Sequence, residues 1–279
     1  MTNRNVVLVT GVSSGFGYLI AKTFASHGWL VYGTVRTIKS VAATELAEQG
    51  VHLITLDVTD KKAIHAGITK ISQEQGRLDV LVNNAGVGYI GATEEFSAEE
   101  IREQFEVNVF GVHEVTRLAL PLLKQSQGKI IMMSSLAARS TAPLYGVYSA
   151  TKQALHALSD ALAFELAPFG VSVLQVEPGS FATNFGKNMK YPQSYTKESP
   201  YQKLYAKYLG FRKNLDARLP WLDRMRNPQK VADLVVRIAY LEQPRQRYTV
   251  GFGSKLALLS VALLPATFRH RIFRWWYGW

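Results

Sequence analysis

The stretch Thr10-Gly11-Val12-Ser13-Ser14-Gly15-Phe16-Gly17 begins at the end of an apolar run, residues 6–10. That run shows no alternation, which is typical of a strand buried on both faces of a parallel sheet. Residues 18–27 follow with apolar side chains at helical spacing, before a glycine stop. Glycines let the backbone turn tightly and approach a ligand, and the N–H groups of the helix behind them suit a pyrophosphate. Taken alone, such a stretch also fits an ordinary tight turn.

The same strand-then-helix pattern repeats along the chain. Apolar runs predict further strands over residues 30–35, 52–56, 78–82, 129–133, 171–177 and 247–250. Helical spacing predicts helices over 39–49, 60–75, 108–124, 148–168 and 231–241, with another that starts near 97–100 and breaks before 108. Alternation of this kind predicts an α/β fold: one Rossmann-type, doubly wound parallel sheet with helices on both faces. We expect a single domain over 1–279, with the loops after the strands along one edge.

Composition limits the classes of partner and chemistry. The 279 residues include no cysteine, so disulfides and thiolate catalysis are excluded. A net charge of +11 favours an anionic partner, such as a phosphorylated cofactor, anionic lipid or nucleic acid, or only a basic solvated surface. Because no nucleic-acid-binding signature is present, we expect no nucleic acid. The N-terminus lacks the features of a signal peptide, and no apolar run reaches the length of a membrane span, which predicts a cytoplasmic protein.

Tyr148 and Lys152 are candidate catalytic residues because they lie four residues apart on a predicted helix and so share a face. A free tyrosine has a pKa near ~10, and a nearby lysine cation lowers it. The pair could then exchange a proton with a substrate alcohol or carbonyl. Ser135, at the end of the preceding strand, could hydrogen-bond the same oxygen. Read alone, the pair fits an amphipathic helix surface equally well.

Several motifs in order make the chain resemble the short-chain dehydrogenase/reductase family over roughly residues 5–185. They are the glycine stretch, Asp57-Val58, Asn83-Asn84-Ala85-Gly86, the Ser135, Tyr148 and Lys152 set, and Pro178-Gly179 with Thr183. The resemblance implies a catalytic tetrad of Asn108, Ser135, Tyr148 and Lys152, and no metal. It assigns the cofactor to Gly11, Ser13, Ser14, Gly15, Phe16, Gly17, Arg36, Asp57, Val58, Asn84, Ala85, Gly86, Tyr148, Lys152, Pro178, Gly179 and Thr183.

The resemblance also implies a reaction. Hydride passes between the nicotinamide and a carbon that carries an alcohol or a carbonyl, with Tyr148 as the general acid in reduction and the base in oxidation. Lys152 lowers the pKa of Tyr148 and holds the nicotinamide ribose, while Asn108 supports a proton relay. Ser135 is chosen over Ser134 because it precedes Tyr148 by thirteen residues, the usual family spacing. Members are usually dimers or tetramers, so we expect a homo-oligomer formed through the helices near 108–124 and 148–168. The alternative is a non-catalytic NADP(H)-binding redox sensor or regulator.

The end of the second predicted strand bears on the choice of cofactor. NAD-specific proteins carry an acidic residue there for the ribose 2′-hydroxyl. This sequence has Arg36 in that region and no acid, and a guanidinium can pair with a 2′-phosphate. We therefore predict NADP(H) over NAD(H), with Lys39 or the hydroxyls of Ser13 and Ser14 as further contacts. The alternative for Arg36 is a solvated surface arginine.

Two segments outside the core motifs point to the substrate. Residues 180–227 form a tyrosine- and lysine-rich insertion that we expect to cover a hydrophobic, lipid-, steroid- or retinoid-like substrate, unless its tyrosines pack on the core or a subunit contact. Residues 255–279 form an apolar and basic extension. As a helix, 268–279 places Phe268, Ile272, Trp275, Trp276 and Trp279 on one face and His270, Arg271 and Arg274 on the other. That pattern fits peripheral contact with the inner face of an anionic membrane, or a cover over the site or a subunit. Similar tails occur in the members resembling retinol and 17β-hydroxysteroid dehydrogenases.

Overall fold

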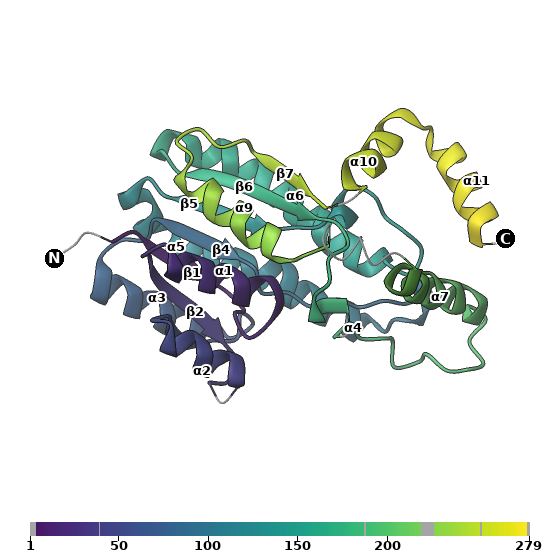
Figure 1. The fold of residues 1–279 in the computed structure, drawn as a ribbon, viewed down its shortest axis with the longest axis horizontal. Helices are drawn as coiled ribbons and strands as arrows, with labels where there is room; N and C mark the ends of the chain where they lie inside the picture. Colours follow the sequence, from purple (N-terminus) through teal and green to yellow (C-terminus); the bar gives the residue numbers. More distant parts are fainter. Residues whose placement is uncertain (1–3, 39, 187, 219–225, 252, 278–279) are drawn as a thin grey trace.

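A seven-stranded sheet runs through the centre of the computed structural model, which describes residues 4–38, 40–186, 188–218, 226–251 and 253–277 (Figure 1). Its strand order is β3-β2-β1-β4-β5-β6-β7, and every neighbouring pair is parallel. The strands are β1 (Val6–Val9), β2 (Leu30–Val35), β3 (His52–Thr55), β4 (Val80–Asn83), β5 (Lys129–Met133), β6 (Ser172–Pro178) and β7 (Arg247–Val250). The direction in which successive strands are added to the sheet reverses between β1 and β4. Ligands of such sheets bind in the crevice beyond the carboxyl ends of the two strands, so we expect the ligand there.

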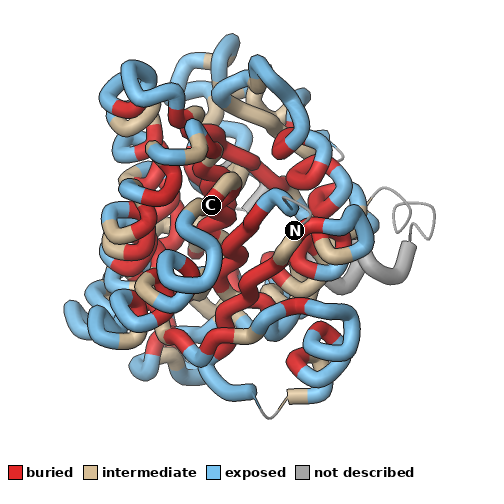
Figure 2. The backbone as a smooth tube through the Cα atoms, turned by 90° about the vertical axis from the view of Figure 1, so that its left-hand side faces the viewer, coloured by how far each residue is buried: buried red, intermediate tan, exposed pale blue. Residues whose placement is uncertain are grey.

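Helices cover both faces of the sheet, as the absence of alternation in the strands predicts. Val7 and Val9 pack toward α1 (Gly15–Ser26), α2 (Val41–Glu48) and α9 (Gln229–Tyr240). Val6 and Leu8 pack on the other side, toward α3 (Lys61–Gln75), α5 (Val112–Ser126) and α6 (Gly146–Leu166). Figure 2 shows the result, with the buried strands between helices whose outer faces are exposed. The α/β prediction is therefore confirmed.

The predicted break before residue 108 is wrong, because the backbone stays helical there. The helix α4 (Ala98–Phe105) leads through one wide π-helical segment, η2 (Glu106–Gly111), into α5. Its start is the predicted one, since the Ser97 hydroxyl accepts the Glu100 N–H and the Glu100 carboxylate accepts the Ser97 N–H. A side chain at Gly111 would lie 2.5 Å from the Val58 carbonyl oxygen, so glycine lets this segment approach the loop after β3. Such π segments are frequent at functional sites.

Shorter helices lie in the connections between these elements. They are η1 (Thr93–Glu95), η3 (Leu136–Ala138), η4 (Ala167–Phe169) and η5 (Asn184–Gly186). Beyond the carboxyl ends of the strands lie α7 (Gln202–Arg218), α10 (Ser254–Leu263) and α11 (Ala266–Tyr277), and Figure 1 shows α10 and α11 projecting from the body as a helical pair. No helix in the described ranges has the length and apolar character that a membrane crossing requires.

Candidate active site

The glycine turn leaves room for a ligand at the start of α1. Gly11 has φ +71° and Gly15 has φ +60°, backbone conformations that favour glycine. A side chain at Gly17 would lie 2.2 Å from the Gly11 carbonyl oxygen, so no larger residue fits. The helix begins at Gly15 rather than at Tyr18, and the exposed Ser14 side chain makes no capping hydrogen bond within the described structure. The first N–H groups of α1 therefore remain available to an anion.

Asn84 and Thr10 hold the glycine turn against the loop after β4. The Thr10 hydroxyl accepts the backbone N–H groups of Asn84 (2.9 Å) and Ala85 (3.0 Å). In return, Nδ2 of Asn84 donates to the carbonyls of Thr10 (2.9 Å) and Gly11 (3.0 Å). Asn84 therefore joins two loops that are far apart in sequence.

Asn108 continues this connection into α6, the helix that carries the candidate residues Tyr148 and Lys152. Its side chain pairs with the backbone of Val87: Oδ1 accepts the N–H at 2.9 Å, and Nδ2 donates to the carbonyl at 2.9 Å. Nδ2 also donates to the Thr151 hydroxyl at 3.1 Å, and that hydroxyl donates to the Tyr148 carbonyl at 2.8 Å. With only 1% of its surface exposed, Asn108 is an internal bridge and no surface residue.

Tyr148, Lys152 and Ser135 come together as the sequence predicts. Tyr148 and Lys152 are both buried on α6, and Lys152 Nζ lies 5.8 Å from the centre of the Tyr148 ring. The same Nζ donates to the Met133 carbonyl at 2.9 Å, near the end of β5. Ser135 follows β5 and caps η3, where its Oγ accepts the Ala137 N–H at 3.1 Å. Ser134 is buried beside it, held by a backbone bond to Val176.

Burial controls the protonation of this pair. It raises the pKa of Tyr148 to about 12, although the hydrogen bond with Ser135 lowers this pKa. Burial also lowers the pKa of Lys152 to about 8. Removal from water is the largest cause of the Tyr148 shift and acts upward, so the lowering of this pKa by Lys152 stays a prediction. The proton therefore stays on Tyr148 at neutral pH, as a proton donor requires.

Other predicted cofactor residues surround the glycine turn. Arg36 follows β2 at the same edge of the sheet, exposed and without an ion-pair partner among the described residues. Lys39 lies outside the described residues, and Ser13 is exposed in the turn. The Asp57 carboxylate accepts the N–H (2.9 Å) and hydroxyl (2.7 Å) of Thr59, and this bond fixes the loop after β3. Val58 is buried behind it.

The segment after β6 returns to the glycine turn. Pro178 ends β6, and the Gly179 N–H donates to the Val250 carbonyl at 2.8 Å. Phe181 contacts Phe16 edge to face, with ring centres 5.6 Å apart. A side chain at Gly15 would lie 3.9 Å from Cβ of Thr183. The predicted motif residues of this segment therefore lie beside α1, across the crevice from the loop after β4.

Two features near Tyr148 escaped the sequence analysis. Leu144 has φ +69°, a strained conformation for leucine that no local signal predicts, and its carbonyl accepts the Gly91 N–H at 2.9 Å. Glu177 is completely buried at the end of β6. An ionisable residue within a strand that is expected to be buried on both faces is the signal that could have marked it.

Comparison with known proteins fits this geometry. The model of the short chain dehydrogenase family matches residues 5–193. The protein belongs to this family. An uncharacterized oxidoreductase, YusZ of Bacillus subtilis, is 35% identical over 94% of this chain and 95% of its own. An NADPH-dependent 3-dehydrocapnine reductase of Ornithobacterium rhinotracheale is 33% identical over 95% of each chain. A solved short-chain dehydrogenase from Streptomyces avermitilis is 35% identical, with a TM-score of 0.79, over 98% of this chain and 96% of its own.

Thr10→Val tests the bridge between the two loops. Valine keeps the shape of threonine but leaves the N–H groups of Asn84 and Ala85 without their acceptor, which costs about 1–3 kcal/mol each when the groups stay buried. We expect urea unfolding to show a loss of at least ~1 kcal/mol. Thr10→Ser keeps the hydroxyl and should lose clearly less. Equal stability of the two variants would show that the bridge contributes nothing.

Proposed function

We propose that this oxidoreductase transfers a hydride between NADP(H) and the carbon of a ketone or secondary alcohol, or of an aldehyde or primary alcohol, on a hydrophobic substrate. The observation that carries the proposal is the grouping of the buried Tyr148 with Ser135, which hydrogen-bonds it, and Lys152, whose Nζ lies 5.8 Å from the centre of its ring. A proton donor whose environment keeps the proton in place fits the reduction of a carbonyl.

The residues at the carboxyl edge fit a dinucleotide. Glycine at position 17 lets α1 pack closely against the Gly11 carbonyl, and the start of α1 supplies N–H groups and a positive dipole end for a pyrophosphate. Arg36, exposed at the end of β2, would take the 2′-phosphate. Asp57 and Val58 would border the adenine, while Pro178, Gly179 and Thr183 would border the nicotinamide. That one relative is named an NADPH-dependent reductase supports this choice.

Side chains of the protein would then orient the substrate oxygen and supply its proton. When bound, the reduced nicotinamide supplies a hydride to the substrate carbon. Tyr148 donates the proton from its Oη to the substrate oxygen, while the Ser135 hydroxyl orients that oxygen. Lys152 stabilises the negative charge left on Tyr148 and would hold the nicotinamide ribose. Asn108 keeps the loop of Val87 fixed to α6, and we assign it a supporting role in returning a proton to Tyr148.

Tyr148→Phe tests the proton donor. We expect kcat for reduction of a hydrophobic ketone or aldehyde, followed as NADPH oxidation at 340 nm, to fall by about 10²–10⁴-fold. Tyr32→Phe is the matched control, because burial also raises the pKa of Tyr32 to about 12, but its hydroxyl bonds Glu74 outside the site. Tyr32→Phe should retain wild-type kcat. Tight NADPH binding without turnover on any substrate would favour the redox-sensor alternative.

Arg36→Gln tests the choice of cofactor. Loss of a charge-assisted contact to the 2′-phosphate should weaken NADPH binding by about ten- to a hundredfold and leave NADH binding unchanged. Fluorescence titration of both cofactors measures this. Arg102→Gln, which removes a 72% exposed arginine from α4, serves as the control. An equal loss for NADPH and NADH would contradict the assignment of Arg36.

The substrate side of Tyr148 is aromatic. Phe185 lies 5.8 Å and Tyr145 lies 6.2 Å from Tyr148 between ring centres. Tyr205 and Tyr208 of α7 are buried in a cluster with Leu144, while Tyr191 stays partly exposed. The described tyrosines of 180–227 therefore pack mostly on the body, and Phe185 of this segment contacts Tyr148. We assign 180–227 the role of covering a hydrophobic substrate.

We also propose a homo-oligomer, a dimer or tetramer, that pairs through α5 and α6. Phe110, Leu158 and Phe164 are exposed by 55%, 38% and 79% on this side of the molecule. Phe164→Glu should shift the protein toward monomer in sedimentation equilibrium, because a buried glutamate in such a contact is unfavourable. Val41→Glu, at a 77% exposed residue of α2 on the other face of the sheet, is the control. An unchanged mass distribution for Phe164→Glu would remove this face from the interface.

The C-terminal helices support peripheral contact with an anionic membrane. Exposed apolar side chains along α10 and α11 are Leu256, Leu259, Leu263, Phe268, Ile272 and Trp275. Lys255, His270, Arg271 and Arg274 are exposed on the same two helices. Phe268, Ile272 and Trp275 of the proposed face are exposed on α11, whereas the Trp276 side chain and Trp279 lie outside the described residues. Apolar and basic groups together suit an anionic bilayer surface.

Leu263→Glu/Trp275→Glu tests this contact. Both residues are largely exposed, at 70% and 83%, so the change should leave the fold intact and reduce co-sedimentation with anionic phospholipid vesicles at least about tenfold. Ile38→Glu/Val41→Glu adds the same charge at exposed apolar sites near α2 and is the control. If the two double variants bind vesicles equally well, α10 and α11 do not make the contact.

A further inference from the structure

Glu177 is a fully buried carboxylate directly before the Pro178-Gly179 motif. On β7, the Thr249 hydroxyl donates to its Oε2 at 2.7 Å. Nη1 of Arg139 lies 3.6 Å from the same oxygen, and Nε2 of His156, on α6, lies 3.3 Å from Oε1. Glu177 therefore contacts three elements that meet behind the active site.

Arg139 is the cation that balances Glu177. Burial lowers the pKa of His156 although the Glu177 charge acts in the opposite direction, whereas the Arg139 guanidinium is always charged. The Arg139 side chain is 39% exposed, so its own desolvation is limited. A buried carboxylate without a cation is strongly unfavourable, which makes the position of Arg139 dependent on Glu177.

The turn that carries Arg139 also carries Ser135. The Arg139 N–H donates to the Leu136 carbonyl at 3.0 Å, and the Ala138 N–H donates to the Ser135 carbonyl at 3.0 Å. One step earlier, the Ser134 N–H donates to the Val176 carbonyl at 2.8 Å, next to Glu177 itself. The Arg139 end and the Ser134 end of this turn are thus both fastened to the end of β6.

We propose that Glu177 and Arg139 are positioning residues for Ser135. Their ion pair holds the 135–139 turn at a fixed place relative to β6, so that the Ser135 hydroxyl faces Tyr148 and the substrate oxygen. A displacement of about 1 Å in such a group can cost about a hundredfold in rate. The proposal rests on the role given to Ser135 in the proposed function.

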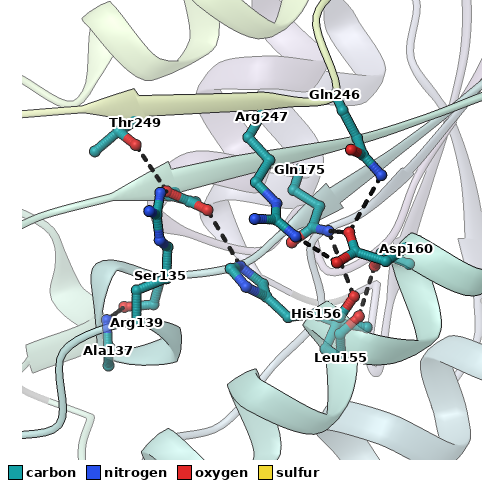
Figure 3. Close-up of polar contacts among 12 residues, drawn as sticks. Ser135, Ala137, Arg139, Leu155, His156, Asp160, Gln175, Gln246, Arg247 and Thr249 are labelled. Carbon is teal, nitrogen blue, oxygen red and sulfur yellow. Dashed lines mark hydrogen bonds and ion pairs between the residues drawn. The ribbon is translucent and has the colours of Figure 1, made fainter. Parts of the chain in front are cut away.

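A second ion pair nearby provides the comparison. Arg247 on β7 pairs with Asp160, one helical turn beyond His156 on α6, and Gln175 also donates to Asp160 at 2.8 Å. The Arg247 side chain is 35% exposed, close to the value for Arg139. This pair fastens α6 to β7 but does not touch the Ser135 turn, as Figure 3 shows. Removal of either arginine tests general stability, whereas only removal of Arg139 tests the position of Ser135.

The experiment compares Arg139→Gln, Arg139→Lys and Arg247→Gln. For Arg139→Gln we expect kcat to fall at least about tenfold, with KM for NADPH within about threefold of wild type, because the substrate oxygen and not the cofactor loses its partner. Arg139→Lys keeps the charge and should recover most of kcat. Arg247→Gln should stay within about twofold of the wild-type kcat.

Hydrogen exchange measured on peptides that cover residues 134–140 provides a readout independent of turnover. We expect exchange to accelerate in Arg139→Gln and to match wild type in Arg247→Gln. Unchanged exchange and kcat in Arg139→Gln, or equal losses in both glutamine variants, would overturn the proposal. If the wild type shows no turnover, the proposed function fails, and the exchange comparison still decides whether Glu177 and Arg139 hold this turn.

Discussion

The active site depends on a chain of hydrogen bonds that joins loops distant in sequence. The Thr10 hydroxyl accepts the N–H groups of Asn84 and Ala85, Asn108 pairs with both backbone groups of Val87, and the Thr151 hydroxyl links Asn108 to the Tyr148 carbonyl. A parallel sheet brings the ends of β1 and β4 together, but it does not fix the loops beyond them. These hydrogen bonds fix the loops, and they hold the glycine turn in a defined position relative to α6.

Much of this arrangement could be predicted from the sequence. Strands without alternation predicted helices on both faces, and the Tyr148–Lys152 spacing predicted a shared helix face because helical geometry is local. Prediction was less accurate where tertiary contacts decide the local structure. The π segment around Asn108 lies where the helix passes close to Val58 at Gly111, and Leu144 adopts a positive φ next to α6. Neither has a signature within its own neighbourhood of sequence.

The direction of the Tyr148 pKa shift could not be predicted from the sequence. Four-residue spacing suggested that Lys152 lowers the pKa of Tyr148, but spacing carries no information about desolvation. In the fold, burial favours the neutral form of both side chains, so it raises the pKa of Tyr148 and lowers the pKa of Lys152. Glu177 shows the same limit, because its partners come from η3, α6 and β7 and only the fold brings them together.

The central claim is that Tyr148 keeps its proton at physiological pH and can donate it. The direct measurement is a carbon-13 NMR titration of protein labelled at the tyrosine ring carbon that bears the hydroxyl, with the Tyr148 signal identified by its absence from Tyr148→Phe. We predict that this signal does not titrate below about pH 10, the range of an unperturbed tyrosine. A midpoint near neutral pH would mean that the phenolate is already populated, and would contradict the account.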